Sequence, residues 1–278
     1  MTIKAVLQHA QNQLENISDS PALDAELLLA HCLDKNRSYL FTWPENTLDE
    51  AQTKCFNLLI EKRLTDYPVA YLLGTKAFWT LDLIVTPNVL IPRPETELLV
   101  EVALNKISNI KTPKILDLGT GTGAIALALA SERPDAQITA CDYSIEALNV
   151  AKLNAENHGL SERVAFIKSN WFSNIEGEFD LIVSNPPYIA ENDPHLSQTI
   201  RHEPRQALVA QNAGMSDIEV LIKECRNHLE NESWIIIEHG YDQGARTLEV
   251  FNKLGFVNAE TRLDISRNPR LSLAQIIT

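Results

Sequence analysis

The sequence predicts an α/β protein in which a small all-helical domain and a β-hairpin linker precede a Rossmann-like domain with a seven-stranded mixed sheet. The first 75 residues carry helix signals and no strand-like run. From Lys114 onward, short apolar segments alternate with helical stretches, which is typical of a parallel sheet covered by helices on both faces. Near the C-terminus two strand-like segments follow each other without a helix, so we expect them to pair antiparallel at one edge of the sheet.

Length and charge limit the class of protein. At 278 residues the chain has room for two domains. We place them at residues 1–75 and 93–278, with the hairpin linker at 76–92. The net charge is −13, and no Lys/Arg-rich stripe is present. Because non-specific binding to nucleic acid depends on clustered cations, naked DNA or RNA is disfavoured as a substrate.

The sequence indicates neither a membrane segment nor a bound metal. The first residues, MTIKAVLQHAQNQ, contain no apolar h-region, and no apolar run approaches the roughly 18 residues that span a bilayer. The four cysteines are scattered without a C-x-x-C pair, which indicates neither a zinc site nor a disulfide framework. We therefore expect a cytoplasmic protein without a metal.

Start signals divide the first domain into helices. Ser20 is a suitable N-cap, and Pro21 a suitable first residue, for a helix over 22–33. The sequence Thr-Leu-Asp-Glu at 47–50 fits a capping box, which opens a second helix to about Leu64.

The second helix is expected to bury Leu58, Leu59 and Leu64. A short helix over 68–73 should then end at Gly74. Because this domain contains no catalytic constellation, we expect it to recognise a partner and not to catalyse.

The linker has the pattern of a β-hairpin. Apolar segments at 77–85 and 89–91 flank Thr86-Pro87-Asn88, which predicts the turn at 86–88. The sequence Pro-Arg-Pro at 92–94 then ends extended structure, and a helix is expected over 95–107.

The second domain follows as alternating elements. Strands are expected at 115–118, 137–141, 164–168, 179–184 and 234–238, and helices at 123–132, 145–157, 217–229 and 243–254. The last two strands are expected at 256–263 and 271–276.

A glycine-rich loop links the first strand of this domain to its first helix. Glycines let the backbone approach a ligand closely and leave helix N–H groups facing it. The loop residues are Asp117, Gly119, Thr120, Gly121, Thr122 and Gly123.

This loop permits two cofactors. It matches G-x-G-x-x-A, and Asp142 ends the next strand, where an acid can bind the ribose of a nicotinamide dinucleotide. However, Asp117 precedes the first glycine by two residues, where its carboxylate would repel a pyrophosphate. The same carboxylate would attract the ammonium and sulfonium groups of S-adenosyl-L-methionine, so this cofactor is favoured.

A stiff turn follows the fourth strand at Asn185-Pro186-Pro187-Tyr188. Neither proline can donate to a sheet ladder, and each restricts the residue before it. The turn therefore presents carbonyl groups that can accept both hydrogens of a planar –NH2 group, while Tyr188 covers its face. It predicts a site for alkylating an amide or amino nitrogen.

Two further residues complete the predicted site. Asn170 and Trp171 follow the third strand, where the indole could stack on adenine. Ligands of open α/β sheets bind at the carboxyl ends of the strands. We therefore expect the residues that follow four consecutive strands to form one site.

With these residues identified, the chain resembles the release-factor glutamine N5-methyltransferases (the PrmC/HemK family) over essentially its full length. The resemblance rests on Asn185–Tyr188, on the glycine loop, on the all-helical first domain and on the linker sequence Ile-Pro-Arg-Pro-Glu-Thr-Glu at 91–97. It implies a class I methyltransferase domain that binds S-adenosyl-L-methionine through 119–123, Asp142 and Trp171, with Asn185 bordering the cofactor. The family usually has Asp at position 170, where this chain has Asn.

The resemblance also implies the substrate. This is the glutamine of a Gly-Gly-Gln tripeptide in class 1 peptide chain release factors, with no direct nucleic-acid partner, and we expect a monomer. The catalytic residues would be Asn185, Pro186 and Tyr188, and Pro187 would complete the substrate site. Glu238-His239, after the fifth strand, is expected to make local hydrogen bonds and not to act as an acid–base pair.

Three alternatives share parts of this pattern. A methyltransferase acting on a ribosomal-protein glutamine would share the whole catalytic half, and an adenine-N6 nucleic-acid methyltransferase would share the Asn-Pro-Pro-Tyr turn. A non-catalytic cofactor-sensing module would not need Asn185, Asp142 and all three loop glycines.

Overall fold

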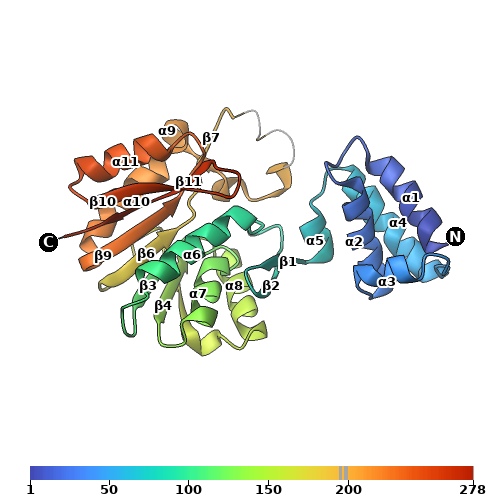
Figure 1. Cartoon of the computed structure of the whole chain (residues 1–278), viewed down its shortest axis with the longest axis horizontal. Coiled ribbons are helices and arrows are strands. Elements are labelled where there is room, and N and C mark those ends of the chain that lie inside the picture. Colours follow the sequence, from blue (N-terminus) through green and yellow to red (C-terminus); the bar gives the residue numbers. More distant parts are fainter. Residues whose placement is uncertain (194–195, 197–199, 278) are drawn as a thin grey trace. The chain divides into compact units, whose positions relative to one another are not determined.

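The structure, a computed structural model, describes residues 1–193, 196 and 200–277. The chain divides into two compact units (Figure 1). The helical unit comprises Met1–Thr75 and Ser197–His202, and the sheet unit comprises Lys76–Leu196 and Glu203–Thr278. The whole predicted hairpin linker, 76–92, therefore belongs to the sheet unit.

Helices with apolar faces form the helical unit. Their bounds are α1 Ile3–Leu14, α2 Pro21–Leu33, α3 Arg37–Thr42, α4 Glu50–Leu64 and α5 Val69–Leu73. In α1 the buried residues Ile3, Val6, Ala10 and Leu14 recur every three or four positions and pack on the other helices. The helix α5 ends at Gly74, which adopts the predicted left-handed conformation (φ 74°).

Two details of α4 differ from the prediction. The N-cap is Asp49, which forms a capping box with Gln52; Thr47 is still extended there and bridges to Thr2. The prediction of the buried face was also wrong in part. Leu58 is half exposed, while the face of α4 that packs inward includes Arg63. A buried arginine cannot be recognised from apolar spacing alone.

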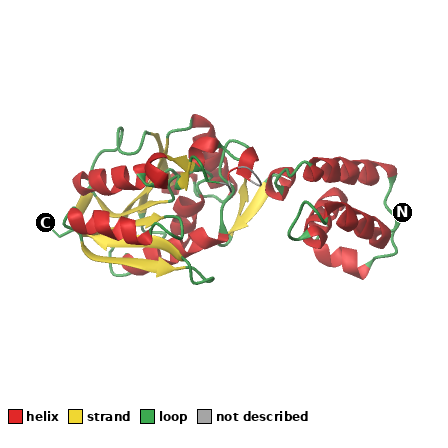
Figure 2. Cartoon of the chain, turned by 90° about the horizontal axis from the view of Figure 1, so that it is seen from above, coloured by secondary structure: helices red, strands yellow, loops and turns green. Residues whose placement is uncertain are grey.

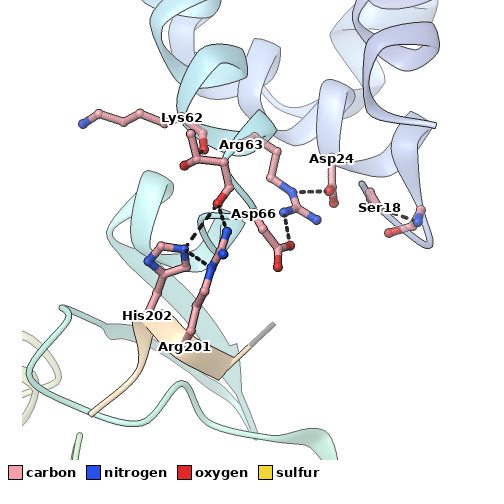
Figure 3. A network of polar contacts seen from close by, with 9 residues as sticks. Ser18, Asp24, Lys62, Arg63, Asp66, Arg201 and His202 are labelled. Atoms are coloured by element: carbon pink, nitrogen blue, oxygen red, sulfur yellow. Dashed lines mark hydrogen bonds and ion pairs between the residues drawn. The ribbon is translucent and has the colours of Figure 1, made fainter. Parts of the chain in front are cut away.

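Arg63 is buried because its charge is paired. Its Nε donates to Asp24 Oδ2 (2.8 Å) on α2, and its Nη1 donates to Asp66 Oδ1 (3.2 Å), as Figure 3 shows. A buried charge is tolerated when opposite charges satisfy it. These contacts connect α4 to α2 and to the turn that precedes α5.

A short segment from a distant part of the sequence belongs to the helical unit. In η4 (Ile200–His202), Arg201 Nη2 donates to the Thr65 carbonyl (2.6 Å), and the His202 ring packs edge-on against Tyr67 (Figure 3 shows the first contact). This attachment could not be inferred from the sequence.

The hairpin turn lies earlier than predicted. Strands β1 (Thr75–Phe78) and β2 (Leu81–Ile84) are joined at Trp79, so the predicted turn at 86–88 was wrong. Trp79 adopts a left-handed conformation (φ 56°), which is uncommon for a bulky residue. Its N–H donates to Glu97 Oε1 and its indole Nε1 donates to Glu132 Oε1. These distant partners stabilise a turn that no local signal marks.

Within the described residues, seven strands form the main sheet in the order β10-β11-β9-β6-β3-β4-β5. The strand bounds are β3 Lys114–Leu118, β4 Gln137–Asp142, β5 Val164–Lys168, β6 Phe179–Ser184, β9 Leu229–Glu238, β10 Val257–Leu263 and β11 Pro269–Gln275. The helix bounds are α6 Glu97–Lys106, α7 Ala124–Glu132, α8 Ile145–Asn157, α10 Ser216–Glu224 and α11 Gly244–Lys253. The predicted mixed sheet, with β10 and β11 antiparallel at one end, is confirmed.

Strand alternation places a core on each face of this sheet. In β6, Leu181 and Val183 pack with α6 and α7, while Ile182 packs with α10 and α11. Figures 1 and 2 show helices on both faces of this sheet. Near-continuous apolar runs are therefore expected for these strands, and they made the strands recognisable in the sequence.

One predicted helix is too long. The prediction extended it to residue 229, but α10 ends at Glu224, and Leu229 begins β9 beside Phe179. Among the described residues, no helix is long and apolar enough to cross a membrane.

Candidate active site

A cavity of about 320 Å³ lies at the carboxyl edge of the main sheet. It is lined by residues that follow β3, β4, β5 and β6, and β3 and β6 are neighbours at the point where the strand order reverses. Ligands of open α/β sheets bind at this switch point. Of the predicted site residues, the lining contains Gly119, Gly121, Asp142, Asn170, Trp171, Asn185 and Pro187.

The glycine loop folds around backbone hydrogen bonds. Gly119 N and Thr120 N both donate to the Cys141 carbonyl (2.9 Å) at the end of β4. Gly119, Gly121 and Gly123 all have positive φ (75°, 55° and 84°), which side chains rarely adopt. A Cβ on Gly119 would also lie 3.3 Å from the Trp171 ring. The loop therefore requires glycine for both its conformation and its packing.

Asp142 holds the loop and also lines the cavity. Its Oδ2 accepts from Gly121 N and its Oδ1 accepts from Ser144 N (both 2.9 Å). Burial raises the pKa of this carboxyl, and these N–H groups act in the opposite direction. The remaining lone pairs can accept hydrogen bonds from ribose hydroxyls.

Trp171 lies next to Gly119 of the loop and is positioned by a residue that the prediction missed. Its indole Nε1 donates to Asp217 Oδ1 (3.2 Å), and Asp217 itself lines the cavity. Trp171 has a positive φ (48°), so its backbone is strained at a ligand site. The neighbouring Asn170 side chain is exposed in the same cavity.

Asp117 is the penultimate residue of β3, two positions before the first loop glycine. It lies beneath the loop, fully buried, and is not part of the cavity lining among the described residues. Thr120 Oγ1 donates to its Oδ2 (2.6 Å), while Oδ1 has no hydrogen-bond partner in the described chain. Burial raises the pKa of this carboxyl to about 7. Direct contact between Asp117 and a cofactor remains a prediction.

Thr122 and Gly123 also lie behind the cavity surface. Thr122 is buried, and its carbonyl accepts from Asn154 Nδ2 (2.9 Å). Gly123 forms the start of α7, where a Cβ would lie 3.1 Å from Leu127. Both residues shape the loop from below.

Asn185 presents an unusual buried acceptor. Its Nδ2 donates to Thr96 Oγ1 (3.2 Å), whereas its Oδ1 is buried and finds no partner among the residues described. A buried acceptor without a partner costs free energy, about 1–3 kcal/mol for an uncharged group. Because Asn185 borders the cavity, a ligand N–H group can satisfy this oxygen.

The rest of the turn is held by its backbone and by Tyr188. Ser184 Oγ donates to the Leu118 carbonyl (2.7 Å), and Pro186 is buried behind the cavity lining. The Tyr188 hydroxyl donates to Glu238 Oε1 (3.4 Å), and the Tyr188 carbonyl accepts from Gln243 Nε2 (2.9 Å). Tyr188 supports the turn here and is outside the cavity lining of the described residues.

Glu238 and His239 have separate partners. Glu238 faces Tyr188, whereas His239 bonds to Ser272 Oγ through Nε2 (2.9 Å) and to the Gly240 carbonyl through Nδ1 (2.8 Å). Burial lowers the pKa of His239. His239 is therefore a buried core residue with local hydrogen bonds.

Two walls of the cavity carried no signal in the sequence. One wall is formed by residues 88–90, which follow the hairpin. The other comes after the turn at Asn185–Tyr188 in the chain and consists of Pro204, Gln206, Ala207 and Val209. Glu203 joins these two segments, because its carboxylate accepts from Ile91 N (3.0 Å) and Arg93 Nη2 (2.5 Å). The sequence offered no periodicity or motif in these segments that would place them at the cavity.

The cavity fits a nucleoside-containing cofactor beside an amide substrate. Asp142 and Trp171 provide a ribose acceptor and an aromatic face, and the glycine loop provides close backbone. The free Asn185 Oδ1 and the Pro186 carbonyl are acceptors suited to a planar –NH2 group.

Comparisons with known proteins identify the family of this chain. The PrmC N-terminal domain matches residues 5–74, and the methyltransferase small domain matches residues 94–215. The release factor glutamine methyltransferase of Aliivibrio fischeri is 45% identical over 99% of this chain and 98% of its own length. That of Escherichia coli is 44% identical over 97% of both chains. The crystal structure of a methyltransferase from Pyrococcus furiosus shares the fold, with a TM-score of 0.54, 18% identity, and coverage of 78% of this chain and 98% of that one.

Proposed function

This chain belongs to the release factor glutamine methyltransferase family, and we propose that it methylates the glutamine of the Gly-Gly-Gln motif in class 1 peptide chain release factors. The methyl group moves from S-adenosyl-L-methionine to the side-chain amide nitrogen (N5). The observation that carries this proposal is the buried, unpartnered Asn185 Oδ1 at the cavity edge in the described chain. The acidic net charge supports a protein substrate over a nucleic acid.

The residues present fit this cofactor. Asp142 would accept from ribose hydroxyls, Trp171 would stack on adenine, and Gly119 and Gly121 leave room for close approach. The Asn170 side-chain carbonyl can accept from the adenine amino group. When bound, S-adenosyl-L-methionine supplies an electrophilic methyl group on a sulfonium.

The chain's own residues prepare the amide nitrogen. Its lone pair is delocalised into the carbonyl, so it is a poor nucleophile. Asn185 Oδ1 and the Pro186 carbonyl would each accept one amide hydrogen, which raises electron density at nitrogen and stops rotation. The extra proton is acidic after transfer and leaves to solvent, so no strong base is required. Pro187, which lines the cavity, would cover the amide, and Tyr188 holds the turn through Glu238 and Gln243.

The helical unit would recognise the folded factor, and we propose that the protein works as a monomer in the cytoplasm. Two observations support the recognition role of the helical unit. This unit has a hydrophobic core of its own, and the candidate site lies within the sheet unit.

The substrate class can be tested without assumption. The protein is incubated with labelled S-adenosyl-L-methionine and a cell lysate, and the labelled macromolecule is identified. We expect one labelled polypeptide, a class 1 release factor. Label in RNA, DNA or a ribosomal protein would instead support one of the competing activities.

The cofactor residues give a second test. Asp142→Ala removes a ribose acceptor and the partner of Gly121 N, and Trp171→Ala removes the stacking face. Loss of a charge-assisted hydrogen bond costs about 1.5–3 kcal/mol, which is roughly ten- to a hundred-fold in affinity. Calorimetric titration with the cofactor measures this, with Asn174→Ala, outside the cavity lining of the described residues, as the control. Unchanged affinity in both variants would reject the assignment.

Removing residues 1–75 should leave cofactor affinity intact but lower kcat/KM for the intact factor by about tenfold or more, because remote binding energy is lost. A short Gly-Gly-Gln peptide should be methylated equally by both forms. The deletion also removes the hydrogen bond from Arg201 to the Thr65 carbonyl. The full-length Arg201→Ala variant loses the same bond but keeps the helical unit, so it is the matched control. An unaltered kcat/KM for the intact factor would refute a recognition role.

A further inference from the structure

A buried chain of polar side chains lies behind Asn185, outside the cavity lining of the described residues. Thr96 and Glu238 are 4% and 1% exposed. Thr96 ends the 3-10 turn η1 (Pro94–Thr96), and Glu238 ends β9, which pairs with β6.

The hydrogen bonds in this chain have a direction. Asn185 Nδ2 donates to Thr96 Oγ1 (3.2 Å), which leaves the single Thr96 hydroxyl proton for another acceptor. That hydroxyl lies near Glu238 and stabilises the ionised form of its carboxylate. On the other side, the Tyr188 hydroxyl donates to Glu238 Oε1 (3.4 Å). The other carboxylate oxygen, Glu238 Oε2, is buried and has no hydrogen-bond partner among the described residues, so it is the acceptor available to the Thr96 hydroxyl proton.

This direction decides which end of the Asn185 amide faces the cavity. The two ends of an amide have nearly the same shape, so only hydrogen bonds distinguish them. If the Thr96 proton is held by Glu238, the Thr96 oxygen must accept, and it selects the Asn185 NH2 group. Asn185 Oδ1 is then turned away from Thr96, which agrees with its having no partner in the described chain.

We propose that Thr96 and Glu238 are positioning residues that fix the Asn185 amide with Oδ1 toward the substrate glutamine. This rests on the proposed function only in naming the substrate; the orientation of Asn185 is a property of the free protein. It gives Glu238 a role in the reaction without contact with the reacting atoms.

The charge of Glu238 controls this device. The groups around its carboxylate are Tyr188, Thr96, Arg270 on β11 and Glu95 on η1, and His239 directly follows Glu238 in the chain. Burial raises the pKa of Glu238 to about 7, against the opposing effects of Thr96, Arg270 and Tyr188. Below this pH the protonated carboxyl can donate to Thr96. The Thr96 proton is then free for Asn185 Oδ1, and the amide can reverse. The rate should therefore fall as the pH decreases through about 7.

The test compares two substitutions at one position. Thr96→Val keeps the shape but removes the hydroxyl, and Thr96→Ser keeps the hydroxyl. Under saturating release factor, we expect Thr96→Val to lower the single-turnover rate about tenfold, with KM and cofactor affinity within about twofold. Thr96→Ser should stay within about threefold of the parent. A parental rate in a folded Thr96→Val protein would overturn the proposal.

Two further measurements separate positioning from loss of structure. Thr96→Val combined with Asn185→Ala should be no slower than Asn185→Ala alone, because the hydroxyl acts through Asn185. Glu238→Gln should lose the fall in rate below about pH 7 that the parent shows. Additive losses in the double variant, or an unchanged pH profile in Glu238→Gln, would contradict the proposal. If the parent does not methylate a release factor at all, the proposed function fails, and the same comparisons on the accepted amide substrate still decide the role of Thr96.

Discussion

Replacing Asn185 with Asp should lower kcat at least about a hundred-fold, equivalent to roughly 2.7 kcal/mol. Asp keeps the shape of the side chain but cannot donate to Thr96 Oγ1, the partner of Asn185 Nδ2. It also brings a second carboxylate close to the buried Glu238, at a cost that burial increases. The side-chain oxygen that faces the substrate amide would then be lost or misdirected. If this oxygen acted only as an acceptor, the charged carboxylate would bind the substrate N–H group more strongly than the amide does.

Single-turnover methylation of the release factor measures this effect. Asn185→Ala should show a loss of similar size, while cofactor affinity should fall much less in both variants. Asn88→Asp is the matched control, because it makes the same chemical change in an exposed side chain of the same cavity, and it should keep the parent rate. An Asn185→Asp protein within about tenfold of the parent rate would show that acceptance alone is sufficient.

Gly214→Ala should unfold the protein more easily and also displace the catalytic turn. A Cβ at this position would lie 2.1 Å from the Tyr188 carbonyl oxygen and 2.5 Å from Gln243 Nε2. Gly214 also has a positive φ (81°), which costs an alanine about 1–2 kcal/mol, and the clash adds about 1–3 kcal/mol. Because the displaced carbonyl belongs to the turn that grips the substrate, kcat should fall by about a hundred-fold.

Urea unfolding and kcat are measured on the same preparations. Gly159→Ala is the control, because Gly159 has a similar φ (66°) but no heavy atom within 4 Å of the added Cβ. It should lose only about 1–2 kcal/mol of unfolding free energy and keep its kcat. Equal effects in the two variants would mean that the contact with Tyr188 is unimportant.

The fold was predictable where local pattern and tertiary structure agree. The strands of the main sheet were found because residues such as Leu181, Ile182 and Val183 are buried on both faces and make continuous apolar runs. The hairpin turn was missed because Trp79 adopts its conformation through Glu97 and Glu132, which are distant in sequence.

The site was predictable only where a motif carries it. The glycine loop, Asp142 and Asn185 each follow a strand, so their meeting at one edge followed from the strand order. Asp217 and the segments joined by Glu203 reach the cavity through tertiary contacts, and no spacing in the sequence encodes those. Contact between Asp117 and the ligand stays a prediction, because this carboxylate is fully buried and accepts from Thr120 Oγ1 in the loop.

The most direct test of the function uses purified release factor and mass spectrometry of the peptide that contains its Gly-Gly-Gln motif. After incubation with the protein and S-adenosyl-L-methionine, we expect the mass increment of one methyl group on the glutamine side chain. A factor with that glutamine replaced by Glu should remain unmodified. Methylation at another residue, or equal methylation of the Glu variant, would contradict the account.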